Sequence, residues 1–320
     1  MKWMAALLGM FFLMSSCSDD ELNPAEKALQ TKTIEWEVFH EFEPGETVVQ
    51  FEISDDAQWL FYYTQMAEAY RVNMKTGTRE RMTARPLELK NNKLYTYALK
   101  DYKSYFGVST DFGASITEYY VGAYTNVAAG WYEGAFIAPM INRMFVMPNG
   151  NLIIPHIMRT ANNSAFLADN KLIVVSEDGG ATWERKETEY SFISAQQGDM
   201  LYAISEGWTG VKSSEILYSD NSGLSWQPSD LIYRPQALDR ENCLIAGSGN
   251  EIQKFKNGAW TTYTWEANSD PLVNVIGLKY EGVRGDDPNG RRIDDFEFDS
   301  ANNLYMIGKN GNTLCRTKLN

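Results

Sequence analysis

The stretch Ser176-Glu177-Asp178-Gly179-Gly180-Ala181-Thr182-Trp183 recurs along this 320-residue chain. It returns as Ser219-Asp220-Asn221-Ser222-Gly223-Leu224-Ser225-Trp226 and, more loosely, as Ser109-Thr110-Asp111-Phe112-Gly113-Ala114-Ser115-Ile116. The shared pattern is Ser-x-Asp/Asn-x-Gly-x-Thr/Ser-Trp/Ile. Because a motif that returns along a chain indicates a repeat architecture, this pattern decides the fold.

Each of the two closest copies follows an apolar, β-prone run, residues 171–175 before the first and 215–218 before the second. We therefore expect each motif to form a hairpin turn. The Asp or Asn side chain can accept backbone N–H bonds within such a turn, and the Gly supplies a positive φ that other residues adopt only at a cost. Trp183 and Trp226 then begin the next strand, where their rings can pack between neighbouring sheets.

The motif resembles the Asp-box, or BNR, repeat of sialidase-superfamily β-propellers. In that family the Asp box lies on the face away from the active site, so the resemblance implies a structural role. The recurrence of the same constellation also favours an Asp178 that ties a turn over a catalytic Asp178. The structural residues of the two closest copies are Ser176, Asp178, Gly180, Trp183, Ser219, Asn221, Gly223 and Trp226.

A second repeat predicts the number of blades. Six times an apolar strand meets a short polar turn and then a strongly β-prone run, as is typical of a propeller of four-stranded blades. The turns are 54–58, 90–93, 147–151, 196–199, 239–242 and 299–303. The chain ends after the third strand of blade six, so we expect residues 33–42 to supply the fourth and remove the exposed edges. The predicted fold is an all-β, six-bladed β-propeller.

The first residues predict a secretory signal. Met1-Lys2-Trp3 is followed by an apolar run from Met4 to Met14, shorter than the ~18 residues that a membrane span needs. A charged start, a short apolar core and small residues are typical of a cleaved signal. Because Cys17 follows Ser15-Ser16, the segment resembles a bacterial lipoprotein signal cleaved before a lipidated Cys17; a plain signal with a chance cysteine is the alternative.

The residues after Cys17 predict where the protein is located. Ser18-Asp19-Asp20-Glu21 resembles the acidic export signal of Bacteroidetes lipoproteins, which implies an outer-membrane lipoprotein exposed on the cell surface. The predicted organisation is a signal peptide at 1–16, a lipidated tether at 17–33 and the propeller at 34–320.

Composition narrows the possible partners. The formal net charge of −13 argues against nucleic acid and against an anionic membrane surface, so membrane contact is expected through the lipid anchor only. With two histidines and no zinc-type spacing of Cys and His, we expect no metal and no cofactor. We expect Cys243 and Cys315 to be buried thiols in separate strands, although a disulfide is allowed outside the cytoplasm.

Two long connections, Thr117–Asn142 and Glu266–Arg292, predict a binding site on the face opposite the Asp-box turns. They would enter blades three and six, on opposite sides of the axis, and functional residues tend to lie on long loops. Aromatic rings in the first can stack on sugar rings or pack within their own loop. Arginines in the second can grip a carboxylate or sulfate, or be neutralised by neighbouring aspartates. The predicted ligand-binding residues are Tyr124, Trp131, Tyr132, Arg159, Trp208, Arg284 and Arg291.

The sequence favours binding over catalysis. Sialidases carry a Phe/Tyr-Arg-Ile/Leu-Pro motif, whereas Tyr233-Arg234-Pro235 lacks the intervening residue and falls in blade five. A fold alone does not assign a function. We expect a non-catalytic propeller that binds glycan or protein. The alternative is a divergent glycoside hydrolase or lyase acting on extracellular glycans, with Glu133, His156 and Glu206 as candidate catalytic residues; a scaffold subunit is a third hypothesis.

Overall fold

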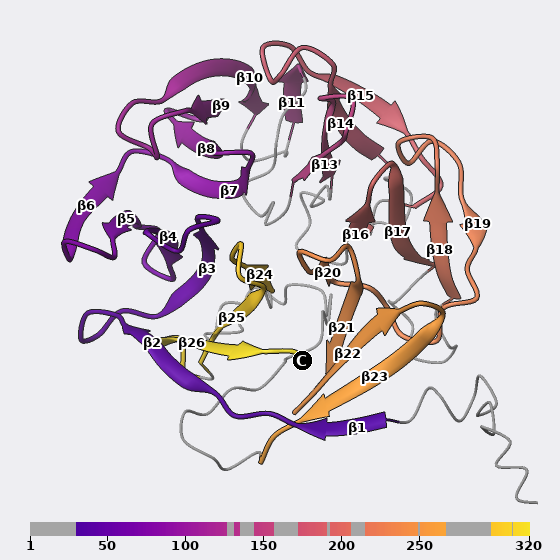
Figure 1. Cartoon of the computed structure of the whole chain (residues 1–320). Coiled ribbons are helices and arrows are strands. Elements are labelled where there is room, and N and C mark those ends of the chain that lie inside the picture. Colours follow the sequence, from indigo (N-terminus) through magenta and orange to yellow (C-terminus); the bar gives the residue numbers. More distant parts are fainter. Residues whose placement is uncertain are drawn as a thin grey trace, which may run out of the picture.

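The computed structural model describes residues 30–126, 131–134, 144–156, 172–190, 193–205, 215–248, 250–266, 296–308 and 310–320. Regular structure in these ranges is β-strand, and none of the described residues forms a helix long and apolar enough to cross a membrane. The strands make six small sheets around a central axis (Figure 1). The chain is therefore a six-bladed β-propeller, which confirms the predicted fold class.

The first three blades follow one another along the chain. Blade 1 contains β3 (Val48–Ile53), β4 (Trp59–Thr64), β5 (Ala69–Asn73) and β6 (Thr78–Met82). Blade 2 contains β7 (Arg85–Lys90), β8 (Lys93–Lys100), β9 (Lys103–Ser109), β10 (Thr117–Asn126) and an additional fifth strand, β11 (Trp131–Gly134). Blade 3 contains β12 (Phe145–Val146), β13 (Leu152–His156), β14 (Leu172–Ser176) and β15 (Glu184–Glu187).

The last three blades bring the two ends of the chain together. Blade 4 contains β16 (Ile193–Gln197), β17 (Met200–Ser205), β18 (Glu215–Ser219) and β19 (Gln227–Pro228). Blade 5 contains β20 (Ala237–Leu238), β21 (Leu244–Ser248), β22 (Glu251–Lys256), β23 (Ala259–Thr264) and the N-terminal β1 (Gln30–Thr33). Blade 6 contains β24 (Glu297–Phe298), β25 (Asn303–Ile307), β26 (Thr313–Lys318) and β2 (Glu37–Glu41).

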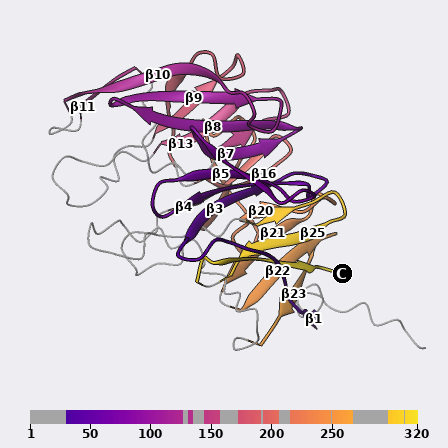
Figure 2. The ribbon, with the colours of Figure 1, turned by 90° about the vertical axis from the view of Figure 1, so that its left-hand side faces the viewer.

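Every turn predicted from the sequence lies at the same end of its blade. The six polar turns join the first and second strands, and the three motif copies join the third and fourth strands of blades 2, 3 and 4. We call this end the turn face. The second-to-third-strand turns and the blade-to-blade connections lie at the other end, the far face. In Figure 2 the turn face is on the right and the far face on the left.

The ring closes with strands from both ends of the chain. β2 pairs antiparallel with β26, as predicted, and Glu37 lies opposite Arg316. β1 adds a further strand to blade 5, parallel with β23, so residues 30–33 of the predicted tether belong to the propeller. Between the two strands, the rings of Trp36 and Trp265 pack edge to face at 5.5 Å. The N-terminal segment therefore spans the rim of blades 5 and 6.

The described core consists of clusters between adjacent blades. Strands alternate their side chains between two faces, so an inner strand packs against both neighbouring blades. Phe51 and Tyr305 meet between blades 1 and 6, for example, whereas Phe61 and Leu94 meet between blades 1 and 2. Cys243, just before β21, and Cys315, in β26, are buried free thiols.

Candidate functional site

The three motif copies form nearly identical hydrogen-bonded turns. In blade 3 the Ser176 hydroxyl donates to Asp178 Oδ1 at 2.8 Å and accepts the Gly180 N–H at 2.8 Å. Asp178 Oδ1 also accepts the Thr182 N–H, and Oδ2 accepts the Thr182 hydroxyl at 2.6 Å. The carboxylate of Asp178 accepts its hydrogen bonds from within the turn, which fits a structural role for this residue.

The other two copies repeat these contacts with their own residues. Asp111 accepts the Ser115 N–H and hydroxyl in blade 2, and Asn221 accepts the Ser225 N–H in blade 4. Asn221 replaces one acceptor oxygen with an amide that donates to Ser225 Oγ at 2.7 Å. Hydrogen bonds from Ser115 and from Thr182 lower the pKa of Asp111 and of Asp178, each to about 2.

The repeated pattern of the turn also packs neighbouring blades together. Trp183 donates its indole N–H to the Gly180 carbonyl at 2.9 Å, and its ring meets Phe106 of blade 2 edge to face at 4.8 Å. Trp226 donates in the same way to the Gly223 carbonyl and to the Thr188 hydroxyl. The expectation that these tryptophans pack between sheets is confirmed.

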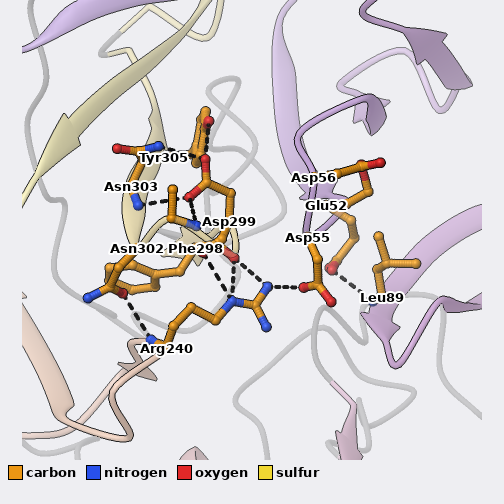
Figure 3. A network of polar contacts seen from close by, with 12 residues as sticks. Glu52, Asp55, Asp56, Leu89, Arg240, Phe298, Asp299, Asn302, Asn303 and Tyr305 are labelled. Carbon is orange, nitrogen blue, oxygen red and sulfur yellow. Dashed lines mark hydrogen bonds and ion pairs between the residues drawn. The ribbon is translucent and has the colours of Figure 1, made fainter.

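A polar network on the turn face links blades 5, 6 and 1 (Figure 3). The guanidinium of Arg240 donates to the carbonyls of Phe298 and Asp299 and forms an ion pair with Asp55. The Arg240 N–H donates to Asn302 Oδ1 at 2.9 Å, and the Ser300 N–H donates to the Asp55 carbonyl at 2.6 Å. The hydrogen-bond donors of Arg240 contact backbone carbonyls, a side-chain amide oxygen and a carboxylate of this chain, so the network joins neighbouring blades. The sequence did not predict this network.

One acidic group near the same face has the residues of a metal site. Carboxylate oxygens of Asp239 and Glu241 and the Cys243 sulfur lie within 4.8 Å of one another. The ammonium of Lys254 contacts Asp239 at 2.7 Å and Glu241 at 3.2 Å, and Lys256 contacts Glu241 at 2.7 Å. The lysines neutralise the carboxylates, so the group is a partly buried ion-pair cluster.

Most of the predicted catalytic, ligand-binding and lipidation residues lie outside the described part of the chain. These are Cys17, Arg159, Glu206, Trp208, Arg284 and Arg291. Five others lie on strands near the far face: Tyr124 is in β10 opposite Tyr132 of β11, Trp131 of β11 is opposite Asn126, Glu133 of β11 is opposite Ala123, and His156 ends β13. The structure therefore brings Tyr124 and Tyr132 into register, whereas the proposed partnership of Glu133, His156 and Glu206 is untested.

The prediction that Thr117–Asn142 forms a loop is wrong for its described part. Residues 117–126 form β10 and residues 131–134 form β11, the fourth and fifth strands of blade 2. β10 pairs with β9, with an irregularity between Tyr120 and Gly122. Because Thr, Tyr and Val are favoured in strands, the β-rich composition of residues 117–124 was a signal against a loop.

Blade 2 carries exposed apolar side chains toward the far face. Tyr102, at the tip of the β8–β9 hairpin, is 61% exposed, Tyr120 is 49% exposed and Leu99 is 43% exposed. Tyr120 meets the ring of Tyr105 at 6.0 Å with an angle of 65°. Lys100 lies 5.6 Å from the Tyr105 ring and is paired with Glu118 at 2.6 Å. We call this region the blade-2 tip, a mixed aromatic and charged surface.

The ring of six blades, each built on four antiparallel strands and two of them extended by a fifth strand, defines the chain as a β-propeller. Solved structures with a similar fold include the Pan2 WD40 domain of Neurospora crassa, which has 9% identity, a TM-score of 0.48 and coverage of 90% of this chain and 98% of that one. YCF48 from Cyanidioschyzon merolae has 12% identity, a TM-score of 0.43 and coverage of 88% and 98%. TolB from Acinetobacter baumannii has 10% identity, a TM-score of 0.38 and coverage of 85% and 54%.

No protein-family model matches the chain, and no curated protein matches it in sequence. The structural likenesses concern the fold and do not identify a ligand. The resemblance of the motif to sialidase-superfamily Asp boxes remains a prediction from the sequence.

Proposed function

We propose that this protein is a cell-surface lipoprotein whose non-catalytic propeller binds a glycan or a protein on its far face. The observation that carries the proposal is the contrast between the two faces. On the turn face, the motif copies and the Arg240 network direct their polar groups to one another. At the far face, blade 2 exposes Tyr102, Tyr120 and Leu99. Exposed apolar side chains that gather on one surface favour a binding role for it, whereas the described turn face exposes one large apolar side chain, Leu224.

The direction of β1 shows from which face the N-terminal segment enters the propeller. β1 is parallel with β23, which runs from the β22–β23 turn on the turn face toward the far face. The chain therefore enters β1 from the turn-face side. A lipid on Cys17 would therefore be joined to the propeller through the turn-face end of β1.

A glycan array tests the binding function. The soluble form lacking residues 1–21 is screened on the array while reducing-sugar release is measured in parallel. We expect binding without release, because the proposed role is recognition. The double substitution Tyr124→Ala/Trp131→Ala should weaken glycan binding at least about tenfold, the usual scale of a lost aromatic anchor. Lys75→Ala on the turn face is the matched control and should bind normally.

The opposite outcomes have definite meanings. Release that is abolished by Glu133→Gln, Glu206→Gln or His156→Gln would replace the binding function with a hydrolase or lyase. If turn-face substitutions abolish binding and the double variant still binds, the binding site lies on the turn face and the proposed far-face site is wrong.

The anchor is tested separately in cells. We expect the full chain to incorporate labelled palmitate, the Cys17→Ser variant to lose the label, and external protease to digest the propeller on intact cells. Labelling that persists in Cys17→Ser would contradict the lipidation site, and protection from protease would contradict surface exposure.

A further inference from the structure

The outer edges of the blades differ in the charge of their fourth strands. In five of the six blades the described fourth strand contains charged residues or a proline, which disfavour pairing with a strand of another molecule. These residues are Arg79, Glu80 and Arg81 in β6, Glu118 in β10, Glu184, Arg185, Lys186 and Glu187 in β15, Pro228 in β19, and Glu37 and Glu41 in β2. β23 of blade 5, Ala259-Trp260-Thr261-Thr262-Tyr263-Thr264, contains neither.

β23 has the composition of a strand that pairs readily. Thr, Trp and Tyr are favoured in strands, and a six-residue segment without charge, proline or glycine is prone to pair with another chain when its edge is exposed. In this structure β1 covers the edge, because residues 30–33 lie parallel with residues 261–264 (Figure 1). The uncharged outer strand is therefore the one whose edge a strand from the other end of the chain protects.

β1 is held on β23 with little apolar burial. Thr31, Lys32 and Thr33 are exposed. The Lys32 ammonium donates to the Asn320 carbonyl at 2.6 Å and lies 5.8 Å from the centre of the Tyr263 ring. The rest of the attachment is backbone pairing, and water can replace most of those hydrogen bonds when β1 detaches.

The anchor of the N-terminal segment follows β1 in the chain. Trp36 is buried and Ile34 is partly buried in the core cluster shared by blades 5 and 6. β2 then closes the ring by pairing with β26. β1 can therefore leave β23 while Trp36 and β2 stay in place, so uncovering the edge does not open the ring.

We propose that β1 keeps this protein monomeric and that, once β1 is displaced, β23 pairs antiparallel with β23 of a second copy of the chain. Two copies related by a two-fold axis present the same strand to each other. The pairing places threonines of one copy beside threonines of the other, which is a favourable cross-strand combination. Two blades then form one continuous sheet.

The charge of the molecule favours this edge for contact between two copies. The formal net charge of −13 makes two copies repel each other. β23 adds no charge to the contact, and a displaced β1 takes Lys32 away with it. The inference concerns the side of blade 5 and does not depend on a ligand at the far face.

The direction of the backbone groups in β1 provides a matched pair of variants. The Ile34 N–H donates to the Thr264 carbonyl at 2.9 Å. Because successive residues of a strand direct their N–H groups to opposite sides, the Lys32 N–H also faces β23 and the Thr33 N–H faces away. Proline has no N–H. Lys32→Pro therefore removes a hydrogen bond to β23, whereas Thr33→Pro preserves the pairing.

The first experiment measures the oligomeric state. Both variants are made in the full chain and purified in a detergent whose density the buffer matches, so that sedimentation equilibrium reports the mass of the protein alone. We expect the wild type and Thr33→Pro to be monomers. Lys32→Pro should form dimers with a dissociation constant at least about tenfold lower, the scale of a lost backbone hydrogen bond.

The outcomes that contradict the proposal are definite. A Lys32→Pro variant that stays monomeric at every concentration would overturn it, as would dimers formed equally by Thr33→Pro. The near-ultraviolet circular dichroism of Lys32→Pro should equal that of the wild type. Its loss would show that β1 is part of the folded core and cannot act as a removable cover.

The second experiment locates the contact between the two copies. Thr262→Lys, added to Lys32→Pro, puts a charge on the β23 edge of both copies and should restore the monomer. Thr110→Lys is the matched control, because Thr110 is exposed in a turn of blade 2, and this substitution should leave the dimer intact. A dimer that persists with Thr262→Lys, or that Thr110→Lys also abolishes, would show that β23 is not the pairing strand.

Discussion

At the scale of single residues, the motif in blade 3 requires glycine at position 180, because a side chain there would overlap the ring of Phe106. Gly180 adopts a φ of 102°, and a Cβ built on it would lie 2.1 Å from Cε1 of Phe106. Gly179, its neighbour in the same turn, has a φ of 72° and nothing within 4 Å of a built Cβ. The two glycines therefore separate backbone strain from steric overlap at one site.

We expect Gly180→Ala to destabilise the protein by about 3 kcal/mol or more, because left-handed strain adds to overpacking against a buried ring. Gly179→Ala should cost only about 1 kcal/mol, from backbone strain alone. Urea denaturation of both variants measures the difference. Equal losses would show that contact with Phe106 does not constrain the turn.

The carboxylate of the same turn predicts a pH dependence. Hydrogen bonds from Thr182 lower the pKa of Asp178 from 3.8 to about 2. A lowered folded-state pKa stabilises the protein above the unfolded pKa, and this stabilisation is lost as the pH falls through the interval between the two values. Asp178→Asn introduces the residue that Asn221 provides in blade 4. We expect this variant to lose less of its free energy of unfolding than the wild type between about pH 4 and pH 2, as measured by urea denaturation. A slope equal to that of the wild type would contradict the assignment.

At the scale of elements, local signals were sufficient for the turns and insufficient for the added strands. The polar turn Asp239–Asn242 and the motif at Ser176–Trp183 encode their geometry within a few residues, so their positions were predictable. β1 is a polar four-residue strand defined only by its pairing with residues 261–264, and no local pattern announces it.

The closing strand β2 contains a titratable group with a shifted pKa. Burial lowers the pKa of His40 below 6.5, Arg79 lowers it further, and Glu41, Glu43 and Glu46 act in the opposite direction. The folded state resists protonation more than the unfolded chain does. The contribution of neutral His40 is therefore present above the unfolded pKa and is lost as the pH falls below it.

We expect the urea midpoint to fall as the pH is lowered from about 7.5 to about 5, and His40→Gln to reduce this dependence. Exchange of β2 amides, corrected for the intrinsic effect of pH, should report the same weakening of the closure. If the urea midpoint depends on pH in His40→Gln as it does in the wild type, groups other than His40 cause the dependence.

At the scale of the whole molecule, the integrity of the ring depends on contacts that join blades across the chain. Arg240 connects blade 5 to carbonyls of blade 6 and to Asp55 of blade 1. We expect Arg240→Leu to lower the free energy of unfolding by about 2–3 kcal/mol, because it removes charged hydrogen bonds. The control is Arg81→Leu, which breaks an exposed pair with Glu68 and should change it by less than about 0.5 kcal/mol. If the two substitutions change the free energy of unfolding by similar amounts, Arg240 does not stabilise the ring by joining blades.

The pairing of β1 and β2 with the last blades also determines the order in which the protein folds. Glu37 meets Arg316 over a separation of 279 residues, and Lys32 meets the carbonyl of Asn320 over 288. Such long closures are entropically costly and slow compared with the hairpins within a blade. During synthesis from the N-terminus, β2 has no pairing strand until β26 emerges. We therefore expect ring closure through β2 and β26 to be a late and slow step of folding.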